Sequence, residues 1–281
     1  MGSPTVRRRR LASELRQLRE RAQLTLEQVA ERLGWSITKV SRVETCKVGV
    51  TPKDVERLLG LYEVTSSKRE EIVGLARDAQ KKGWWHAYGD LPTEYATYIG
   101  LEAEAASVRC FASEIIPGLL QTEDYARAVI RAALITSPPG EIERRVQVRM
   151  ARQRLLSEVP PLRLWTIIDE AALRRAVGGP DVIRDQMRRL LDVADVPTIA
   201  VQVLPFGAGA HAATCGAFEL LEFPERADPD VAFLENLTGS LYVEDERDVY
   251  RYTLAFDHLR AKALDLGESC ELIAEILGRA G

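Results

Sequence analysis

TLEQVAERLGWSITKVSRVE, from Thr25 to Glu44, is the stretch that decides the fold of the N-terminal part of this chain. Its apolar residues from Leu26 to Leu33 recur at i, i+3, i+4 and i+7, which predicts a helix of about eight residues with one buried face. Thr25, with Gln28 three places on, matches a capping box, and Gly34 suits the left-handed position just past a helix end. The sequence therefore encodes both ends of this helix.

A second helix is predicted after a turn of about three residues, with Ser36 as its N-cap. Ile37, Val40 and Val43 are expected to point inward. The outer face then carries Thr38, Lys39, Ser41 and Arg42. Hydroxyl, ammonium and guanidinium groups contact base edges and phosphates, so the pair has the layout of a helix-turn-helix.

Two amphipathic helices joined by a glycine also occur in domains that bind no nucleic acid, where the polar outer face is only solvated. Three features favour DNA binding: the serine cap, the absence of Asp and Glu from the outer face before Glu44, and helical patterns on both sides of the pair. We therefore predict that the outer face of the second helix contacts DNA.

Residues 10 to 64 resemble the Xre or lambda-repressor type of helix-turn-helix domain, which implies an all-α, lambda-repressor-like unit of five helices. The matching positions are Leu15, Leu18, Arg19, Leu24, Thr25, Ala30, Leu33, Gly34, Ser36, Ser41, Arg42 and Glu44. The predicted DNA-binding residues are Thr25, Ser36, Thr38, Lys39, Ser41, Arg42 and Lys47. Leu26 departs from the family pattern, because many relatives have Gln there to contact a phosphate. The backbone amides at this helix start remain available to a phosphate.

The first helix precedes this pair. Arg7 to Arg10 form either a flexible arm on the DNA backbone or the solvated start of that helix. Arg19 is the predicted ion-pair partner of Glu44, in a structural role. Thr51-Pro52 predicts the start of a fourth helix, and a fifth is expected from Ser66 or Ser67 to Lys82.

The length and composition of the chain predict two globular domains. It has 281 residues, of which 46% are hydrophobic, enough to fill more than one core. The sequence has no apolar run of about 18 residues and no signal-peptide pattern at its start, so we expect a cytoplasmic protein that does not enter a membrane. Its four cysteines are far apart and it has three histidines, so we expect no metal site, no disulfide framework and no cofactor.

The charge is unevenly distributed. Residues 1 to 82 hold 18 Lys and Arg against 11 Asp and Glu, a net charge of +7, which leaves -11 on the other residues because the chain sums to -4. A basic N-terminal third attracts phosphates, whereas the acidic remainder is repelled by DNA. The C-terminal part is therefore predicted to have a different role.

Residues 83 to 105 are predicted to be an aromatic-rich linker or hinge between a DNA-binding domain at 1 to 82 and a second domain at 106 to 281. Trp84, Trp85, Tyr88 and Tyr95 fall within this segment. They either hold the two domains together or line a surface for a partner, since Trp and Tyr dominate such contacts.

The second domain has the pattern of an α/β fold. Helices are predicted at 122 to 134, 141 to 156, 180 to 194, 246 to 264 and 268 to 277, and strands at 162 to 168, 198 to 204, 217 to 223, 231 to 237 and 241 to 243. The helix at 180 to 194 separates the first two strands, which is the order of a βαβ unit with parallel strands. The arginines of the helix at 141 to 156 are predicted to form a solvated face or, for Arg145, Arg149 and Arg152, a contact for a partner.

No catalytic motif is complete in this domain, and we predict no enzymatic activity. The segment Gly207 to Ala212 reads GxGxxA but is followed by a strand pattern, so it lacks the helix N-terminus that would bind a dinucleotide. His211, with Asn236, Gly239 and Ser240, weakly resembles a phospholipase D half-site. Ala213 stands where that family has a catalytic Lys, so the resemblance implies a degenerate fold of this type and not a catalyst. The acidic groups Asp169-Glu170 and Glu244-Asp245-Glu246 are interpreted as helix-starting charges.

The whole chain resembles a family of actinobacterial regulators of the WhiJ-like type. The resemblance is carried by Ile115 to Val129, Val148 to Leu156 and Val203 to Phe223. It implies an antitoxin-like transcriptional regulator encoded beside a small acidic partner of the BldB-like type. We expect a homodimer on an inverted-repeat operator, because one such domain reads too few base pairs for a unique site. A metabolite-sensing regulator and a DNA-targeted, phosphodiester- or nucleotide-processing enzyme are the alternatives.

Overall fold

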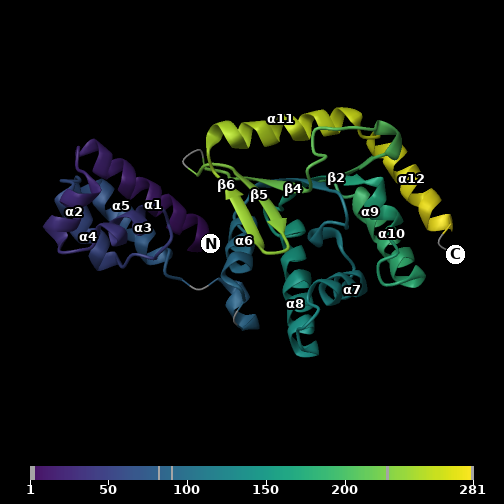
Figure 1. Cartoon of the computed structure of the whole chain (residues 1–281), viewed down its shortest axis with the longest axis horizontal. Helices are drawn as coiled ribbons and strands as arrows, with labels where there is room; N and C mark the ends of the chain where they lie inside the picture. The colour runs from purple at the N-terminus through teal and green to yellow at the C-terminus, as the bar shows by residue number, and fades with distance from the viewer. Residues whose placement is uncertain (1–3, 82, 90, 226–227, 280–281) are drawn as a thin grey trace. The chain divides into compact units, whose positions relative to one another are not determined.

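The computed structural model describes residues 4–81, 83–89, 91–225 and 228–279. It divides into two compact units, Met1–Glu104 and Ala105–Gly281. The helices described in the N-terminal unit are α1 (Pro4–Arg21), α2 (Leu26–Leu33), α3 (Ile37–Glu44), α4 (Pro52–Leu61), α5 (Ser66–Asp78), the short 3-10 helix η1 (Trp84–Tyr88) and α6 (Thr93–Glu102) (Figure 1). The expected all-helical N-terminal region is confirmed.

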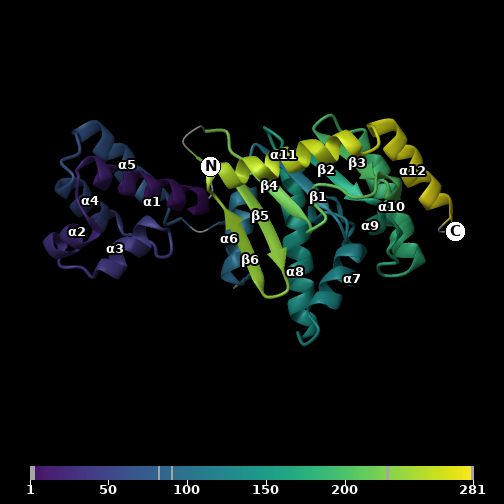
Figure 2. The same ribbon diagram turned by 45° about the horizontal axis from the view of Figure 1, so that its top comes forward.

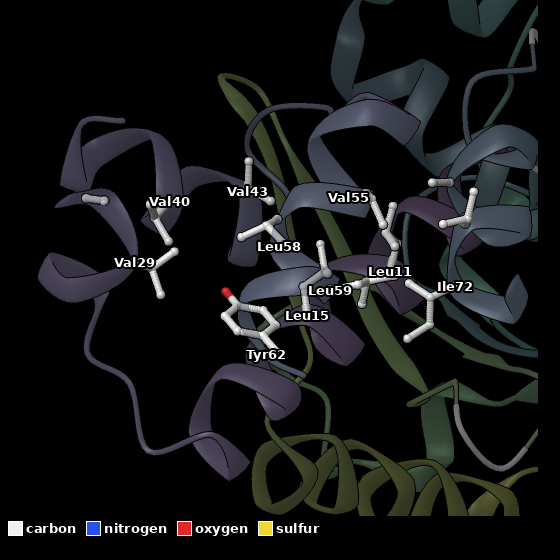
Figure 3. Close-up of a cluster of buried hydrophobic side chains, with 13 residues drawn as sticks. Leu11, Leu15, Val29, Val40, Val43, Val55, Leu58, Leu59, Tyr62 and Ile72 are labelled. Carbon is white, nitrogen blue, oxygen red and sulfur yellow. The ribbon is translucent and has the colours of Figure 1, made fainter. Parts of the chain in front are cut away.

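The core of the N-terminal unit is built by α1 to α5 (Figure 3). Its buried members are Leu11, Leu15, Val29, Ala30, Val40, Val43, Val55, Leu58, Leu59, Tyr62, Ile72, Val73 and Ala76. Each fully buried aliphatic side chain of this kind contributes about 1.5 to 3 kcal/mol to folding. Because Val29 and Ala30 from α2 share this core with Val40 and Val43 from α3, the core fixes how the two helices cross.

The start of the first helix decides between two predicted alternatives, and the end of the fifth helix differs from prediction. The first helix begins at Pro4, so Arg7 to Arg10 lie on a helix and not on a flexible arm, with Arg7 3.3 Å from the carboxylate of Asp78. The fifth helix ends at Asp78, and the predicted end at Lys82 lies outside the described residues. Helix ends are stabilised mainly by packing of an apolar face, and Gln80 and Lys81 are exposed.

The C-terminal unit is organised around a mixed sheet. In the described part of the chain this sheet has six strands, β1 (Ser107–Ala112), β2 (Arg163–Asp169), β3 (Ile199–Leu204), β4 (Phe218–Glu222), β5 (Val231–Asn236) and β6 (Gly239–Val243). Their order is β3-β2-β1-β4-β5-β6 (Figure 2). The first three strands are parallel neighbours, and β4, β5 and β6 join them as antiparallel neighbours.

Helices cover both faces of the sheet. The described helices of this unit are η2 (Gly118–Leu120), α7 (Glu123–Ala133), α8 (Pro139–Arg152), η3 (Gln153–Leu156), α9 (Glu170–Arg174), α10 (Pro180–Ala194), η4 (Phe206–Ala208), α11 (Glu246–Lys262) and α12 (Leu266–Arg279). Figure 1 shows α11 on one face and α7, α8 and α10 on the other. Phe256 and Leu259 of α11 pack on Phe111, Ile167 and Phe218 of the strands.

The α/β class and the predicted parallel strand pair are confirmed, since β2 and β3 are parallel and α10 connects them. The prediction missed β1, which lies between β2 and β4 in the sheet. Its sequence SVRCFA carries Arg109 in the middle, which interrupts the apolar run that predicts a central strand. In the structure Arg109 forms an ion pair with Glu222 of the neighbouring strand β4, so the charge is tolerated there.

Candidate nucleic-acid interface

The helix-turn-helix is formed by α2 and α3 with caps at each predicted position. The side chain of Thr25 accepts a hydrogen bond from the Gln28 amide, and the Gln28 side chain accepts one from the Thr25 amide at 2.9 Å, which completes the capping box. Gly34 has φ +67°, the left-handed conformation that favours glycine, and ends α2. Ser36 caps α3 by accepting from the Lys39 amide at 3.1 Å.

The predicted contact residues occupy different environments on this motif. Thr25, Ser36, Thr38, Arg42 and Lys47 are exposed, and Lys39 and Ser41 are half-buried. The oxygens of Thr25 and Ser36 already accept cap hydrogen bonds. A hydroxyl that accepts a bond can still donate its own hydrogen, so Ser36 can also donate to a phosphate oxygen. The Thr25 hydroxyl already donates to the Glu27 side chain. Thr38 and Arg42 present their side chains to solvent on the outer face of α3.

Ile37 is more exposed than its spacing predicted. We expected it to point inward with Val40 and Val43, but its side chain is 47% exposed. It is the first residue of α3, so no preceding turn of the helix covers its side chain. An exposed isoleucine beside polar contact residues suits the methyl group of thymine. The i, i+3 spacing alone did not predict that Ile37 is exposed and available for contact with DNA.

Arg42 has an unengaged guanidinium. Within the described part of the chain it forms no hydrogen bond or ion pair through its side chain, and it lies in the last turn of α3. Arginine donates two parallel hydrogen bonds to the O6 and N7 atoms of guanine, the commonest specific contact in the major groove. Arg42 is therefore the side chain of α3 best placed to read a base.

Arg19 and Glu44 form the predicted structural ion pair, which is confirmed. Arg19 Nε lies 2.8 Å from Glu44 Oε1, Nη2 lies 2.9 Å from Oε2, and Nη1 donates to the carbonyl of Leu24 at 2.8 Å. The side chains are only 12% and 6% exposed. The hydrogen bonds to Glu44 raise the pKa of Arg19 above its ordinary value and outweigh the opposing effect of burial. This pair fixes the end of α3 to α1.

Comparison with known families agrees with this geometry. Residues 10–72 match a model described as a helix-turn-helix domain. Residues 95–275, more than half of the chain, match the model of a domain of unknown function, DUF5753. The chain belongs to the DUF5753 family. No curated protein and no solved structure matches this chain. None of the helices in the described ranges is both long and apolar enough to cross a membrane.

Three aromatic residues just before the DUF5753 match pack on one another. The rings of Trp84 and Trp85 meet edge to face with centroids 6.1 Å apart, and Trp84 meets Tyr88 in the same way at 5.9 Å. Trp85 is buried, whereas Trp84, Tyr88 and Tyr95 are half-buried. Such pairs stabilise the segment beyond the burial of their area. Three of the four predicted partner-contact aromatics thus keep accessible surface.

The arginine helix of the DUF5753 domain, α8, is less solvated than we predicted. Arg152 is only 4% exposed, and Arg149 donates to Gln121 Oε1 at 2.9 Å. Arg145 donates to Glu141 at 2.8 Å. Arg149 bonds to the loop that follows η2, because that loop presents the polar side chain of Gln121. The spacing of residues along α8 does not predict this contact. Arg152 is an interior residue and not part of a solvated face.

The acidic pairs of the DUF5753 domain start helices, as predicted. Asp169 accepts a hydrogen bond from the Ala171 amide at 2.8 Å at the start of α9, and Asp245 accepts from the amides of Arg247 and Asp248 at the start of α11. Glu170, which is buried, accepts from the Phe206 amide at 2.8 Å. A carboxylate at a helix start is stabilised by the free amides there, so these residues need no catalytic role.

His211 and Asn236 also have local structural partners. His211 Nδ1 accepts a hydrogen bond from the Ala213 amide at 3.3 Å, and its ring meets that of Phe111 at 5.4 Å between centroids. Asn236 Oδ1 accepts from the amides of Thr238 and Gly239 in the turn between β5 and β6. GAGAHA is followed by a turn and β4, as predicted, so it does not open a helix.

Proposed function

We propose that this member of the DUF5753 family is a sequence-specific DNA-binding transcriptional regulator. The observation that carries the proposal is the capped helix α3, which presents an unengaged Arg42 beside exposed Thr38 and Ile37 within a region that matches a helix-turn-helix model. The net charge of +7 on residues 1 to 82, from 18 basic and 11 acidic residues, supports it because DNA is strongly anionic.

We assign separate roles to the contact residues. Arg42 and Ile37 read base edges in the major groove, while the backbone amides at the starts of α2 and α3 meet phosphates. The residues proposed to touch the DNA backbone are Thr25, Ser36, Thr38, Lys39, Ser41 and Lys47. The buried pair of Arg19 and Glu44 holds α3 in position and touches no DNA.

The test begins with selection of duplexes from a randomised library by the full-length protein. Arg42→Ala should then weaken binding to the selected duplex by about 1 to 3 kcal/mol and relax the preference at the base it reads. Arg77→Ala is the matched control, since Arg77 is an exposed arginine of α5, outside the motif. Fluorescence anisotropy measures both. Wild-type affinity and selectivity in Arg42→Ala would reject α3 as the recognition helix.

We further propose that the regulator is of the Xre type and antitoxin-like, and that its C-terminal unit receives a signal from a small acidic protein encoded beside it. The resemblance to WhiJ-like actinobacterial regulators supports this part of the proposal. We propose two separate candidate surfaces for this partner. One is formed by the half-buried aromatic residues Trp84, Tyr88 and Tyr95, and the other by the outward part of α8 around Arg145. A degenerate phospholipase-D-like fold of the C-terminal unit is also proposed, and it rests on a separate resemblance carried by His211, Asn236, Gly239 and Ser240.

Calorimetry with that neighbouring protein tests the signal. We expect binding at micromolar concentrations that weakens in salt, because charged contacts steer the encounter, and a change in DNA affinity when the partner is bound. Arg145→Ala should weaken binding, whereas Arg188→Ala, on α10, should not. Absence of binding at tens of micromolar would make a metabolite the better candidate for the signal.

A further inference from the structure

A second ion pair on α3, between Lys39 and Asp54, is more exposed to solvent than the pair of Arg19 and Glu44. Lys39 Nζ lies 3.2 Å from Asp54 Oδ2 of α4 and 3.7 Å from the centroid of the Trp35 ring in the turn before α3. An ammonium at this distance from an indole is attracted to the ring face. In the described structure Lys39, one of the two predicted DNA-contact cations of α3, is thus held by two groups of its own domain.

Asp54 is positioned independently of Lys39. Its amide donates to Thr51 Oγ1 at 3.1 Å in the first turn of α4, where the helix dipole favours a carboxylate. Arg57 lies 3.9 Å from Asp54 Oδ1, but its Nη2 is held by the carbonyl of Leu33 at 2.7 Å. Asp54 is therefore a pre-formed acceptor at the side of α3.

The solvent exposure of the two ion pairs indicates which one can exchange. Arg19 and Glu44 share several hydrogen bonds and are 12% and 6% exposed, whereas Lys39 and Asp54 share one contact and are 39% and 22% exposed. Pairs that water reaches are weak, and the flexible lysine stem lets the ammonium move several ångströms without moving the helix. A DNA phosphate that approaches α3 can therefore compete with Asp54 for Lys39.

We propose that Asp54 holds Lys39 in the free protein and releases it to a DNA phosphate on binding, so that Asp54 sets the affinity of the N-terminal unit for DNA. The exchange replaces one ion pair with another, so Lys39 contributes less to net affinity than a free lysine would. Removal of the Asp54 charge abolishes the competition and tightens binding. This inference rests on the proposed DNA-binding function.

The experiment is a double-mutant cycle on the full-length protein. The variants are Asp54→Asn, Lys39→Gln and the double variant, and Glu56→Gln is the control, because Glu56 is an exposed carboxylate of the same helix with no side-chain contact to Lys39 in the described structure. The probe is the duplex that the wild-type protein enriches most from a randomised library. Affinity is measured over a range of salt concentrations, and thermal unfolding confirms that each variant is folded.

Asp54→Asn should tighten binding about two- to fivefold more than Glu56→Gln does, the range expected for an exposed ion pair. In the Lys39→Gln background this excess should vanish. Lys39→Gln should also lower the slope of log affinity against log salt by about 0.9, the signature of one lost phosphate contact. The slope should fall by the same amount whether Lys39→Gln is made in the wild-type protein or in the Asp54→Asn variant.

Two results would overturn the exchange. If Lys39→Gln leaves the salt slope unchanged, Lys39 stays on Asp54 in the complex and the pair is a static link between α3 and α4. If Asp54→Asn and Glu56→Gln change DNA affinity equally, Asp54 affects binding only through the negative charge that any carboxylate of α4 adds, and not through Lys39. Both results are obtained with a protein that binds DNA, so they leave the proposed function standing. Failure of the wild-type protein to enrich any duplex would instead reject the function and the exchange together.

Discussion

The hydroxyl of Tyr62 is an unfavourable feature inside the N-terminal core. Tyr62 is 7% exposed and packs with Leu58 and Leu59, and its oxygen has no hydrogen-bond partner among the described residues (Figure 3). Burial raises the pKa of Tyr62 above its ordinary value, and the charge of Glu44 adds to this shift. A buried polar group without a partner costs folding free energy, because it loses its bonds to water.

We expect Tyr62→Phe to be neutral or to stabilise the protein by up to about 1 kcal/mol, since it removes only the unsatisfied oxygen. Tyr125→Phe is the matched comparison, because the Tyr125 oxygen accepts a hydrogen bond from the Ile116 amide at 3.2 Å. That variant should destabilise by about 1 to 3 kcal/mol, since it leaves a buried amide unpaired. Urea unfolding measures both. A loss of stability in Tyr62→Phe would show that the hydroxyl has a partner such as ordered water.

Strand β3 illustrates how an element at the edge of the sheet is protected. Its neighbour in the sheet is β2, and its other side is met by the segment between α11 and α12. The Leu264 amide donates to the Val203 carbonyl at 2.9 Å, and the Val203 amide donates to Ser269 Oγ at 3.0 Å. A loop amide and a side chain of α12 thus replace the strand that would otherwise satisfy β3.

Ser269→Ala should destabilise the C-terminal unit by about 1 to 3 kcal/mol, because it leaves the buried Val203 amide without an acceptor. Exchange of the Val203 amide hydrogen should accelerate in the same variant, and nuclear magnetic resonance follows both changes. Ser157→Ala, at an exposed serine after η3, should change the free energy of unfolding by less than about 0.5 kcal/mol. Equal effects of the two substitutions would contradict the protective role of Ser269.

The whole molecule combines a basic N-terminal region with an acidic remainder. Residues 1 to 82 carry a net charge of +7, from 18 basic and 11 acidic side chains, and this charge attracts DNA. The other residues carry -11, which brings the whole chain to -4, and this charge repels DNA. The described C-terminal unit fits this division, since Glu225, Glu244 and Glu246 line a pocket of about 430 Å³ there. We therefore expect contact with DNA to be concentrated in the helix-turn-helix.

We predict that the whole protein binds as a dimer to an inverted repeat, because one α3 reads about four to six base pairs and two half-sites must lie about one helical turn apart. Light scattering should show a dimer at micromolar concentration on the selected duplex. Insertion of about 5 base pairs between the half-sites turns them to opposite faces of the duplex and should abolish tight binding. A monomer in solution and on DNA, indifferent to this insertion, would contradict the prediction.

The sequence by itself determined the elements whose ends are encoded locally. Thr25, Gln28, Gly34 and Ser36 specify caps through contacts within a few residues, so both ends of α2 and the start of α3 were predictable. The same holds for α10 between two apolar strands, which predicted the parallel pair of β2 and β3. Local hydrogen bonds and periodic burial are properties of short stretches, which a sequence displays directly.

Only the tertiary structure decided the features that depend on residues far apart in the chain. The charge of Arg109 prevented the prediction of β1, because its partner Glu222 lies on β4, far away in the sequence. The residue pattern of α8 likewise did not predict that Arg152 is buried. In the candidate interface, periodicity placed Ile37 inside and Lys39 on the outer face, whereas Ile37 is 47% exposed and Lys39 pairs with Asp54. A side chain's partner is set by which surfaces meet in three dimensions, and spacing along one helix does not contain that information.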